Sequence, residues 1–93
     1  MNLMVKVSVI IPVYNGEKFI EKCINSILNG TYQNFELIVI NDGSKDNSLK
    51  VLKKFDKNKK IRIYSQKNHG ASYTRNIGLK KAIGKYVEMH PLE

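Results

Sequence analysis

The sequence predicts an α/β domain built on an open, mostly parallel sheet, with strand order 3-2-1-4 and helices on both faces. Short β-branched apolar runs alternate along the chain with longer segments whose apolar residues recur at helical spacing. The connections between them are short and polar, and this alternation of strands and helices requires parallel strands with right-handed crossovers. With 93 residues, the chain is long enough for one domain with one core.

The first strand is predicted at residues 6–11, a β-branched apolar run that is followed by Pro12. A run this short suits a strand that is buried on both faces of a sheet. From Glu17 onwards the spacing becomes helical, and Gly30 follows as a stop signal. We expect Cys23 to lie in the core on the apolar side of this helix. That side consists of Phe19, Ile20, Cys23, Ile24, Ile27 and Leu28.

The middle of the chain predicts a second strand, a second helix and a third strand. Residues 35–40 are another continuous apolar run, which ends in the turn-forming residues 41–44. Ser44 or Asp46 is expected to cap the helix that follows. A charged turn then leads to the third strand at residues 61–64. The apolar side of the second helix is expected to consist of Leu49, Val51, Leu52 and Phe55.

The end of the chain predicts a third helix over about residues 71–83 and a fourth strand over residues 85–89. The helix follows the turn formers at residues 68–70. Gly84 stands where a helix C-terminus favours glycine. The buried side of this helix is expected to consist of Ile77, Leu79, Ala82 and Ile83.

Composition restricts the class of protein. Hydrophobic residues make up 42% of the chain and charged residues 26%, which is ordinary for a folded globular domain. No apolar run approaches the roughly 20 residues that span a bilayer. Residues 1–6 lack the basic and apolar regions of a signal peptide, so we predict a cytoplasmic protein. Cys23 is the single cysteine, which excludes a disulfide framework and a cysteine-rich metal site.

The formal net charge is +8, and much of it comes from lysines between residues 50 and 60. We interpret this cluster as a solvated helix face. It is also compatible with a phosphate-rich partner or an anionic membrane, so peripheral contact with the inner face of the membrane stays open. No aromatic residues alternate with these lysines, and we therefore expect no nucleic-acid partner. A basic nucleic-acid-binding module and a non-catalytic α/β binding module are the alternative functions.

A ligand site is expected at one edge of the predicted sheet, because ligands bind beyond the carboxyl ends of parallel strands. Polar, turn-forming loops are predicted there at residues 12–16, 41–44 and 66–72. The chain has neither a G-x-G-x-x-G segment after its first strand nor a G-x-x-x-x-G-K-[ST] segment. A dinucleotide fingerprint and a P-loop are therefore not supported, and any nucleotide must be held in another way.

Three blocks resemble the signature segments of the inverting family 2 glycosyltransferases. They are residues 7–16 (VSVIIPVYNG), 35–44 (FELIVINDGS) and 71–79 (ASYTRNIGL). The resemblance covers nearly the whole chain. It implies a GT-A fold, which is the Rossmann-like fold of nucleotide-diphospho-sugar transferases, and a donor that is most often a UDP-sugar. It also implies a glycan or lipid-linked acceptor.

The resemblance assigns the nucleotide to the first two loops. Tyr14 would stack on the uracil, because every base presents a π face, unless it only closes the first strand. Asp42 would accept the uracil N3–H, since a carboxylate is a strong acceptor, and its alternative role is to cap the second helix. Pro12 would shape the loop around the base, next to Asn15. Ser44 is interpreted as either a ligand or a cap.

The resemblance assigns the diphosphate to the third block. Arg75 would bind it, because a guanidinium group forks onto phosphate oxygens, although an ordinary surface arginine is the alternative. Asn76 either binds phosphate or holds the loop. His69 and His90 are interpreted as loop residues without a catalytic role.

The resemblance ends near the C-terminus of the chain. After residues 84–87 the family continues into an acidic D-x-D-type segment that binds a divalent metal, Mg²⁺ or Mn²⁺, whereas this chain reads EMHPLE. We therefore expect no catalytic residue and no metal within residues 1–93, a single truncated nucleotide-sugar-binding domain, and a metal in the full-length enzyme. Residues 92–93 are interpreted as a cloning junction. We also expect these residues to be catalytically inactive alone and to form a homodimer through the exposed edge of the fourth strand.

Overall fold

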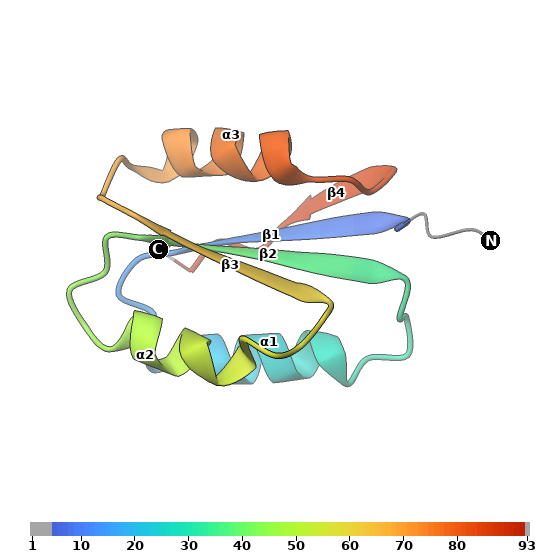
Figure 1. Cartoon of the computed structure of the whole chain (residues 1–93), viewed down its shortest axis with the longest axis horizontal. Helices are drawn as coiled ribbons and strands as arrows, with labels where there is room; N and C mark the ends of the chain where they lie inside the picture. The colour runs from blue at the N-terminus through green and yellow to red at the C-terminus, as the bar shows by residue number, and fades with distance from the viewer. Residues whose placement is uncertain (1–4, 93) are drawn as a thin grey trace.

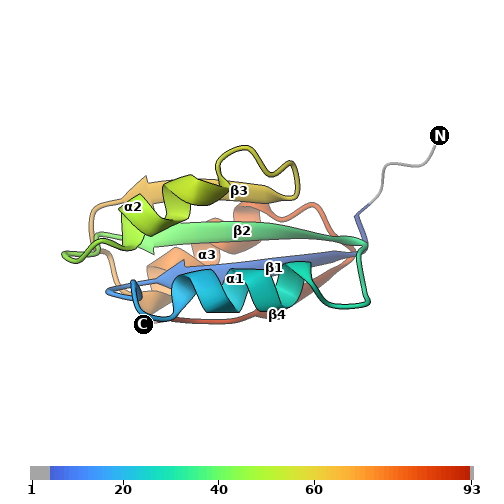
Figure 2. The ribbon, with the colours of Figure 1, turned by 90° about the horizontal axis from the view of Figure 1, so that it is seen from below.

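The computed structural model describes residues 5–92, which form a parallel sheet between two helical layers (Figure 1). Helices α1 and α2 cover one face of the sheet and α3 covers the other, as Figures 1 and 2 show. The strand order is β3-β2-β1-β4, and all neighbouring strands are parallel, so the predicted fold class and strand order are confirmed. The elements are β1 (Val7–Val13), α1 (Ile20–Leu28), β2 (Phe35–Asp42), α2 (Ser48–Leu52), the 3₁₀ helix η1 (Lys53–Phe55), β3 (Ile61–Gln66), α3 (Ala71–Lys81) and β4 (Tyr86–Met89).

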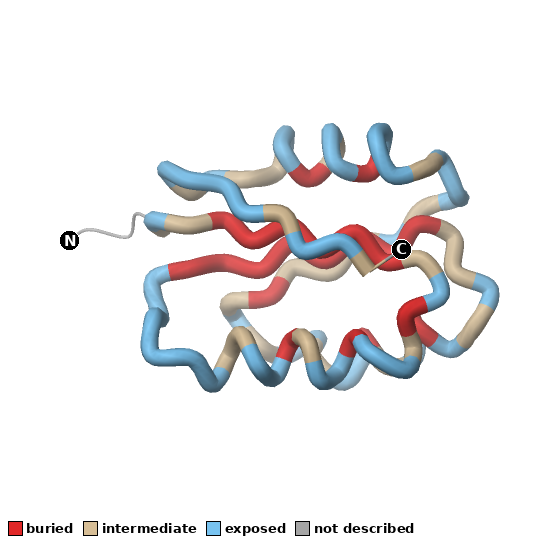
Figure 3. The backbone as a smooth tube through the Cα atoms, turned by 180° about the vertical axis from the view of Figure 1, so that it is seen from behind, coloured by how far each residue is buried: buried red, intermediate tan, exposed pale blue. Residues whose placement is uncertain are grey.

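Strands β1 and β2 form the centre of the core, and β2 is buried along its whole length (Figure 3). Successive side chains of a strand point to opposite faces of the sheet, so each strand supplies both sides of the core. Leu37 and Val39 pack in the cluster that includes Ile24 of α1. Ile38 and Ile40 pack in the opposite cluster, under α3.

The strands extend further at their carboxyl ends than the apolar runs predict. β1 continues through Pro12 to Val13, and β2 continues through Asp42. Proline has no backbone N–H to donate to a neighbouring strand. Pro12 nevertheless fits inside a central strand, because its carbonyl accepts the Leu92 amide at 2.8 Å. The side of Pro12 that would carry the N–H therefore faces the segment after β4 rather than β2. The prediction that Pro12 ends the strand and lies in the loop is therefore wrong.

Helix α3 buries small residues where large ones were expected. Thr74 and Gly78 are buried, whereas Leu79 is 46% exposed and Ile83, beyond the helix end, is 67% exposed. A Cβ atom at Gly78 would clash with Cγ2 of Ile10 in β1. The helix therefore lies so close to the sheet that its small face must turn inward, and the predicted burial of Leu79 and Ile83 is wrong. Ile77 and Ala82 pack against the core as expected.

Two further expectations about the helices need correction. The first helix starts at Ile20, and Phe19, which was expected on its apolar side, is 63% exposed. Cys23 is half-buried and packs against the core, and this burial raises the pKa of its thiol. Gly84 is no left-handed C-cap. A Cβ at Gly84 would lie 2.7 Å from the amide and hydroxyl of Ser8, so close approach to β1 is what requires glycine there.

Among residues 5–92, no helix is long and apolar enough to cross a membrane. The prediction that residues 1–6 are no signal peptide falls largely outside the described part of the chain, which excludes residues 1–4. Glu93, the second residue of the predicted cloning junction, also lies outside it.

Candidate functional site

The loops after β1 and β2 are hydrogen-bonded to each other at the carboxyl edge of the sheet. The amide of Asn15 donates to Ser44 Oγ at 3.0 Å, and Asn15 Oδ1 accepts the amide of Lys45 at 2.8 Å. Asn15 has a φ of 53°, a left-handed conformation that asparagine tolerates better than most residues. The structure therefore brings the predicted site residues Asn15 and Ser44 together.

Asp46, rather than Ser44, stabilises the start of α2. Its Oδ1 atom accepts the amide of Ser48 at 2.9 Å, and its Oδ2 atom accepts the amide of Glu17 at 3.2 Å. Burial alone would raise the pKa of Asp46, but the hydrogen bonds from Ser48 and Glu17 hold it below its usual value. Neither Ser44 nor Asp42 therefore caps α2, which was the alternative role predicted for each of them.

Asp42 is buried at the end of β2, and its carboxylate holds the loop between β3 and α3. Its Oδ1 accepts the His69 amide at 2.8 Å and Gln66 Nε2 at 3.0 Å, and its Oδ2 accepts the Gly70 amide at 3.1 Å. Burial would raise the pKa of Asp42, but these three hydrogen bonds and the neighbouring Thr74 hydroxyl lower it, so the carboxylate is ionised at neutral pH. The Asp42 carbonyl also accepts Asn68 Nδ2 at 3.0 Å.

Glycines make this junction of loops possible. Gly43 has a φ of 69°, and a Cβ atom there would lie 2.5 Å from the amide nitrogen of Asn68. Gly70, with a φ of 89°, turns the chain into α3. The left-handed backbone and the close approach both disfavour any larger side chain at Gly43.

Arg75 and Tyr14 border neighbouring cavities at the same edge. The first, of about 170 Å³, lies between the amino end of α3 and the segment that follows β4. The second, of about 280 Å³, lies beside the loop after β1, and Pro91 borders both. Asp42 lines neither cavity, and Asn76 is exposed on α3. The first cavity is lined by Pro12, Ala71, Ser72, Arg75, Met89 and Pro91, and the second by Tyr14, Asn15, Gly16, Phe19, Pro91 and Leu92.

Sequence reasoning missed an ion pair between the buried Glu36 and the partly exposed Arg62 at the opposite, amino edge of the sheet. Glu36 Oε1 accepts Arg62 Nη2 at 2.7 Å, and its Oε2 accepts Ser8 Oγ at 2.6 Å and the Ile83 amide at 2.9 Å. Burial would raise the pKa of Glu36, but these hydrogen bonds and the charge of Arg62 lower it. A glutamate inside an apolar strand was the one signal in the sequence that pointed to this network.

The histidines occupy loop positions, as expected. The ring of His69 lies 4.3 Å from the ring of Tyr73, and His90 Nε2 lies 3.5 Å from Glu88 Oε1. Within the described residues, no three His, Cys, Asp or Glu side chains lie close enough together to hold a metal ion.

A sequence model described as glycosyl transferase family 2 matches residues 8–88. The chain belongs to glycosyl transferase family 2. This match spans β1 to β4 and contains most of the residues of the three blocks on which the resemblance was based, so the resemblance is confirmed.

Curated relatives of this family 2 chain are glycosyltransferases by name. An uncharacterized glycosyltransferase of Rickettsia bellii is 49% identical over 82 residues, which is 88% of this chain and 12% of the relative. The glycosyltransferase GlyA of Streptococcus pneumoniae is 45% identical over 83 residues, again 88% of this chain and 12% of the relative. The chain thus spans a small part of the length of these relatives.

Solved structures share the fold of this family 2 chain. TarS 1–349 of S. aureus in complex with UDP superposes with a TM-score of 0.83 at 31% identity, over 92% of this chain and 27% of TarS. A mannosyltransferase of Pyrobaculum calidifontis, in complex with GDP-Man and Mn²⁺, has a TM-score of 0.76 at 21% identity, over 87% of this chain and 25% of that one. The GT-A type of fold expected from the sequence is therefore confirmed.

Proposed function

We propose that this chain binds the nucleotide part of a nucleotide-diphosphate sugar, specifically a UDP-sugar, for transfer of the sugar to a glycan or lipid-linked acceptor. The observation that carries this proposal is the hydrogen-bonded junction of three loops at the carboxyl edge of the sheet, from Asn15 through Ser44 and Asp42 to Gly70. Ligands bind at this edge in open parallel sheets. Structures of TarS in complex with UDP and with UDP-GlcNAc support the choice of donor.

Tyr14 and Asp42 are proposed to bind the base. Tyr14 is half-buried beside the second cavity, where its ring can stack on a base. A carboxylate has about four acceptor positions, and three of those on Asp42 are used by Gln66, His69 and Gly70. One acceptor position is therefore left for a base imide. Because Asp42 is fully buried, the base reaches it only when the loop over residues 67–70 shifts.

Arg75 is proposed to bind the diphosphate. Its side chain is exposed at the cavity of about 170 Å³, next to the first turn of α3. Among the described residues it forms no ion pair, so its donors are available to a ligand. The amides of the first helical turn also favour an anion at this end of α3. Asn76 remains a proposed second contact.

Titration of the chain with UDP and with uridine tests this assignment. Arg75→Ala is expected to weaken UDP binding about tenfold or more, because hydrogen bonds to charged groups contribute about 1.5–3 kcal/mol. Uridine binding should be nearly unchanged, since uridine has no phosphate. Lys80→Ala is the matched control, because it removes a cation from an exposed position of the same helix. Equal losses for UDP and uridine would contradict the role of Arg75, and wild-type chain that binds neither would contradict the proposed function.

The remaining features of the proposal concern partners, cofactor and location. A divalent metal is expected for the complete enzyme, but within residues 5–92 no three His, Cys, Asp or Glu side chains lie close enough together to hold one. A homodimer through β4 is supported by its exposed edge, where Tyr86 is 53% and Val87 40% exposed. A cytoplasmic location with peripheral contact at the inner face of the membrane stays a prediction.

A further inference from the structure

The side of β2 that faces α3 carries a buried carboxylate at each end. Side chains two residues apart share a face of a strand, so Glu36 and Asp42 lie on the same side as Ile38 and Ile40, which pack under α3. Asp42 accepts the Gly70 amide, immediately before α3, and Glu36 accepts the Ile83 amide, shortly after it. Helix α3 is thus held at both ends by one strand.

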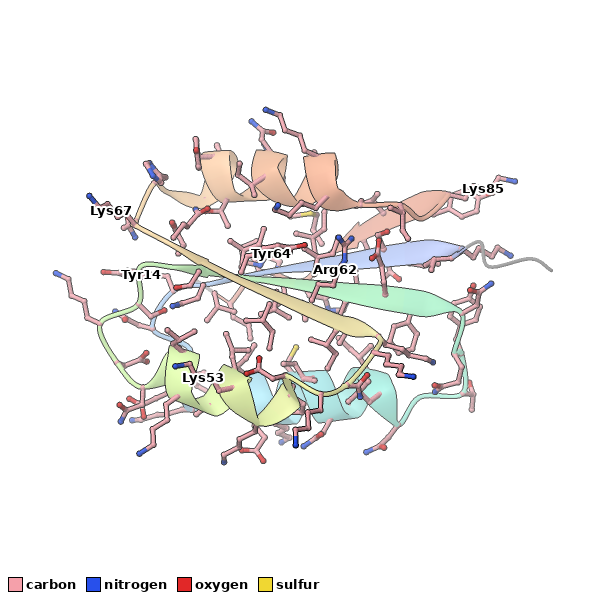
Figure 4. All side chains as sticks on the ribbon, in the orientation of Figure 1. Tyr14, Lys53, Arg62, Tyr64, Lys67 and Lys85 are labelled. Atoms are coloured by element: carbon pink, nitrogen blue, oxygen red, sulfur yellow. The ribbon has the colours of Figure 1, made fainter. Side chains whose placement is uncertain are left out.

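The network at the Glu36 end fixes the turn between α3 and β4. Arg62 Nη2 donates both to Glu36 and, at 2.6 Å, to the carbonyl of Lys81, the last residue of α3. Ser8 Oγ donates to Glu36 and accepts the amide of Gly84 at 2.8 Å. Strand β3 and strand β1 therefore both contact the turn through polar side chains. Figure 4 shows Arg62 pointing from β3 toward the α3 side of the sheet.

We propose that Glu36 is a positioning residue for the nucleotide site, because it holds the α3–β4 turn and thereby sets the distance between the two walls of the cavity that contains Arg75. One wall is α3, with Ser72 and Arg75, and the other is formed by Met89 and Pro91 at and after the end of β4. The turn is the covalent link between these walls. The inference rests on the proposed function, since the cavity matters only if it receives the diphosphate.

The role requires a carboxylate rather than any polar group. Four hydrogen bonds converge on the two oxygens of Glu36, from Ser8, the Ile83 amide and two nitrogens of Arg62. A glutamine has one oxygen and one donor amide, so in either orientation its NH₂ group faces donors. The Glu36→Gln change keeps the size of the side chain and removes the ability to hold both Arg62 and the turn.

Amide hydrogen exchange of the 93-residue chain tests whether Glu36 holds the turn. In Glu36→Gln, the amides of Ile83 and Gly84 are expected to exchange about tenfold faster or more, while those of the β2 core keep their relative protection. Glu21→Gln is the matched control, because Glu21 carries the same group in an exposed ion pair with Lys54. Uniform acceleration of all protected amides would overturn the proposal, because it indicates global destabilisation alone.

Binding measurements on the same variants test whether the turn positions the site. Glu36→Gln is expected to weaken UDP binding about fivefold and leave uridine within about twofold, since only the phosphate end depends on Arg75. If Glu36→Gln fails to fold, the same two measurements on Ser8→Ala test the positioning role. This change removes one donor to Glu36 and the acceptor of the Gly84 amide. Selective exchange of the turn with unchanged UDP binding would overturn the positioning role. If wild-type chain binds neither ligand, the proposed function fails, and the exchange data still decide whether Glu36 holds the turn.

Discussion

Replacing Gly78 by alanine tests the close contact between α3 and the sheet. The added Cβ would clash with Cγ2 of Ile10 and would lie 3.1 and 3.2 Å from its Cδ1 and Cγ1 atoms. Ile10 is fully buried and branched at Cβ, so its Cγ2 atom cannot rotate away. Overpacking costs about 1–3 kcal/mol, and the upper part of this range, about 2–3 kcal/mol, applies here because the clashing atom cannot move aside. Alanine is favoured over glycine in a helix by about 1 kcal/mol, so the expected net destabilisation is about 1–2 kcal/mol.

Urea unfolding followed by circular dichroism measures this effect. A slope of about 1 kcal/mol per molar urea for a chain of this size makes the expected shift of the midpoint about 1–2 M. Lys80→Ala, at an exposed position of the same helix, is the control and should stay within about 0.5 kcal/mol of wild type. In an Ile10→Ala background the cost of Gly78→Ala should largely disappear, because the clashing atoms are gone.

The opposite sign of the stability change would refute this reasoning. If Gly78→Ala were as stable as wild type or more stable, helix propensity would dominate, and α3 could not lie as close to β1 as the structure has it. The same result would also argue against the position of Arg75, because Arg75 is part of α3.

Three further outcomes are expected. Asp42→Ala should reduce the preference for UDP over GDP in calorimetric titrations, and an unchanged preference would exclude Asp42 from base recognition. The pKa values of Glu36 and Asp42 are lowered in the fold, so their stabilisation is present above the unfolded pKa of about 4 and is lost as pH falls through the folded values. The urea midpoint should therefore decrease as the pH is lowered from about 5 to about 3, and the decrease should be smaller in Glu36→Gln. A midpoint independent of pH would refute this expectation. Val87→Lys should shift light scattering toward monomer if β4 edges pair, whereas identical scattering would argue against that interface.

Much of the fold follows from local patterns in the sequence. The four strands, the three main helices and their order were predicted because apolar spacing and turn-forming residues act over a few neighbours along the chain. The three loops of the candidate site were predicted at the correct edge of the sheet, since the carboxyl ends of parallel strands share one edge, but β1 and β2 extend through Pro12 and Asp42, which were assigned to the loops. The error at Leu79 arises because apolar spacing does not say which face of a helix meets the sheet. The errors at Phe19 and Ile83 arise because the same spacing does not fix where a helix begins and ends, and both residues lie just outside their helices.

The sequence by itself determined the class of fold, the family resemblance and the identity of the polar loops at the site. Only the tertiary structure decided that Asp42 is buried under the β3–α3 loop and that Glu36 joins Arg62 and the Ile83 amide. The reason is physical: Glu36 and Ile83 are separated by 47 positions in the chain, and Ser8 and Gly84 by 76. Contacts over such separations depend on how closely α3 packs on the sheet, and no local pattern of residues encodes that distance.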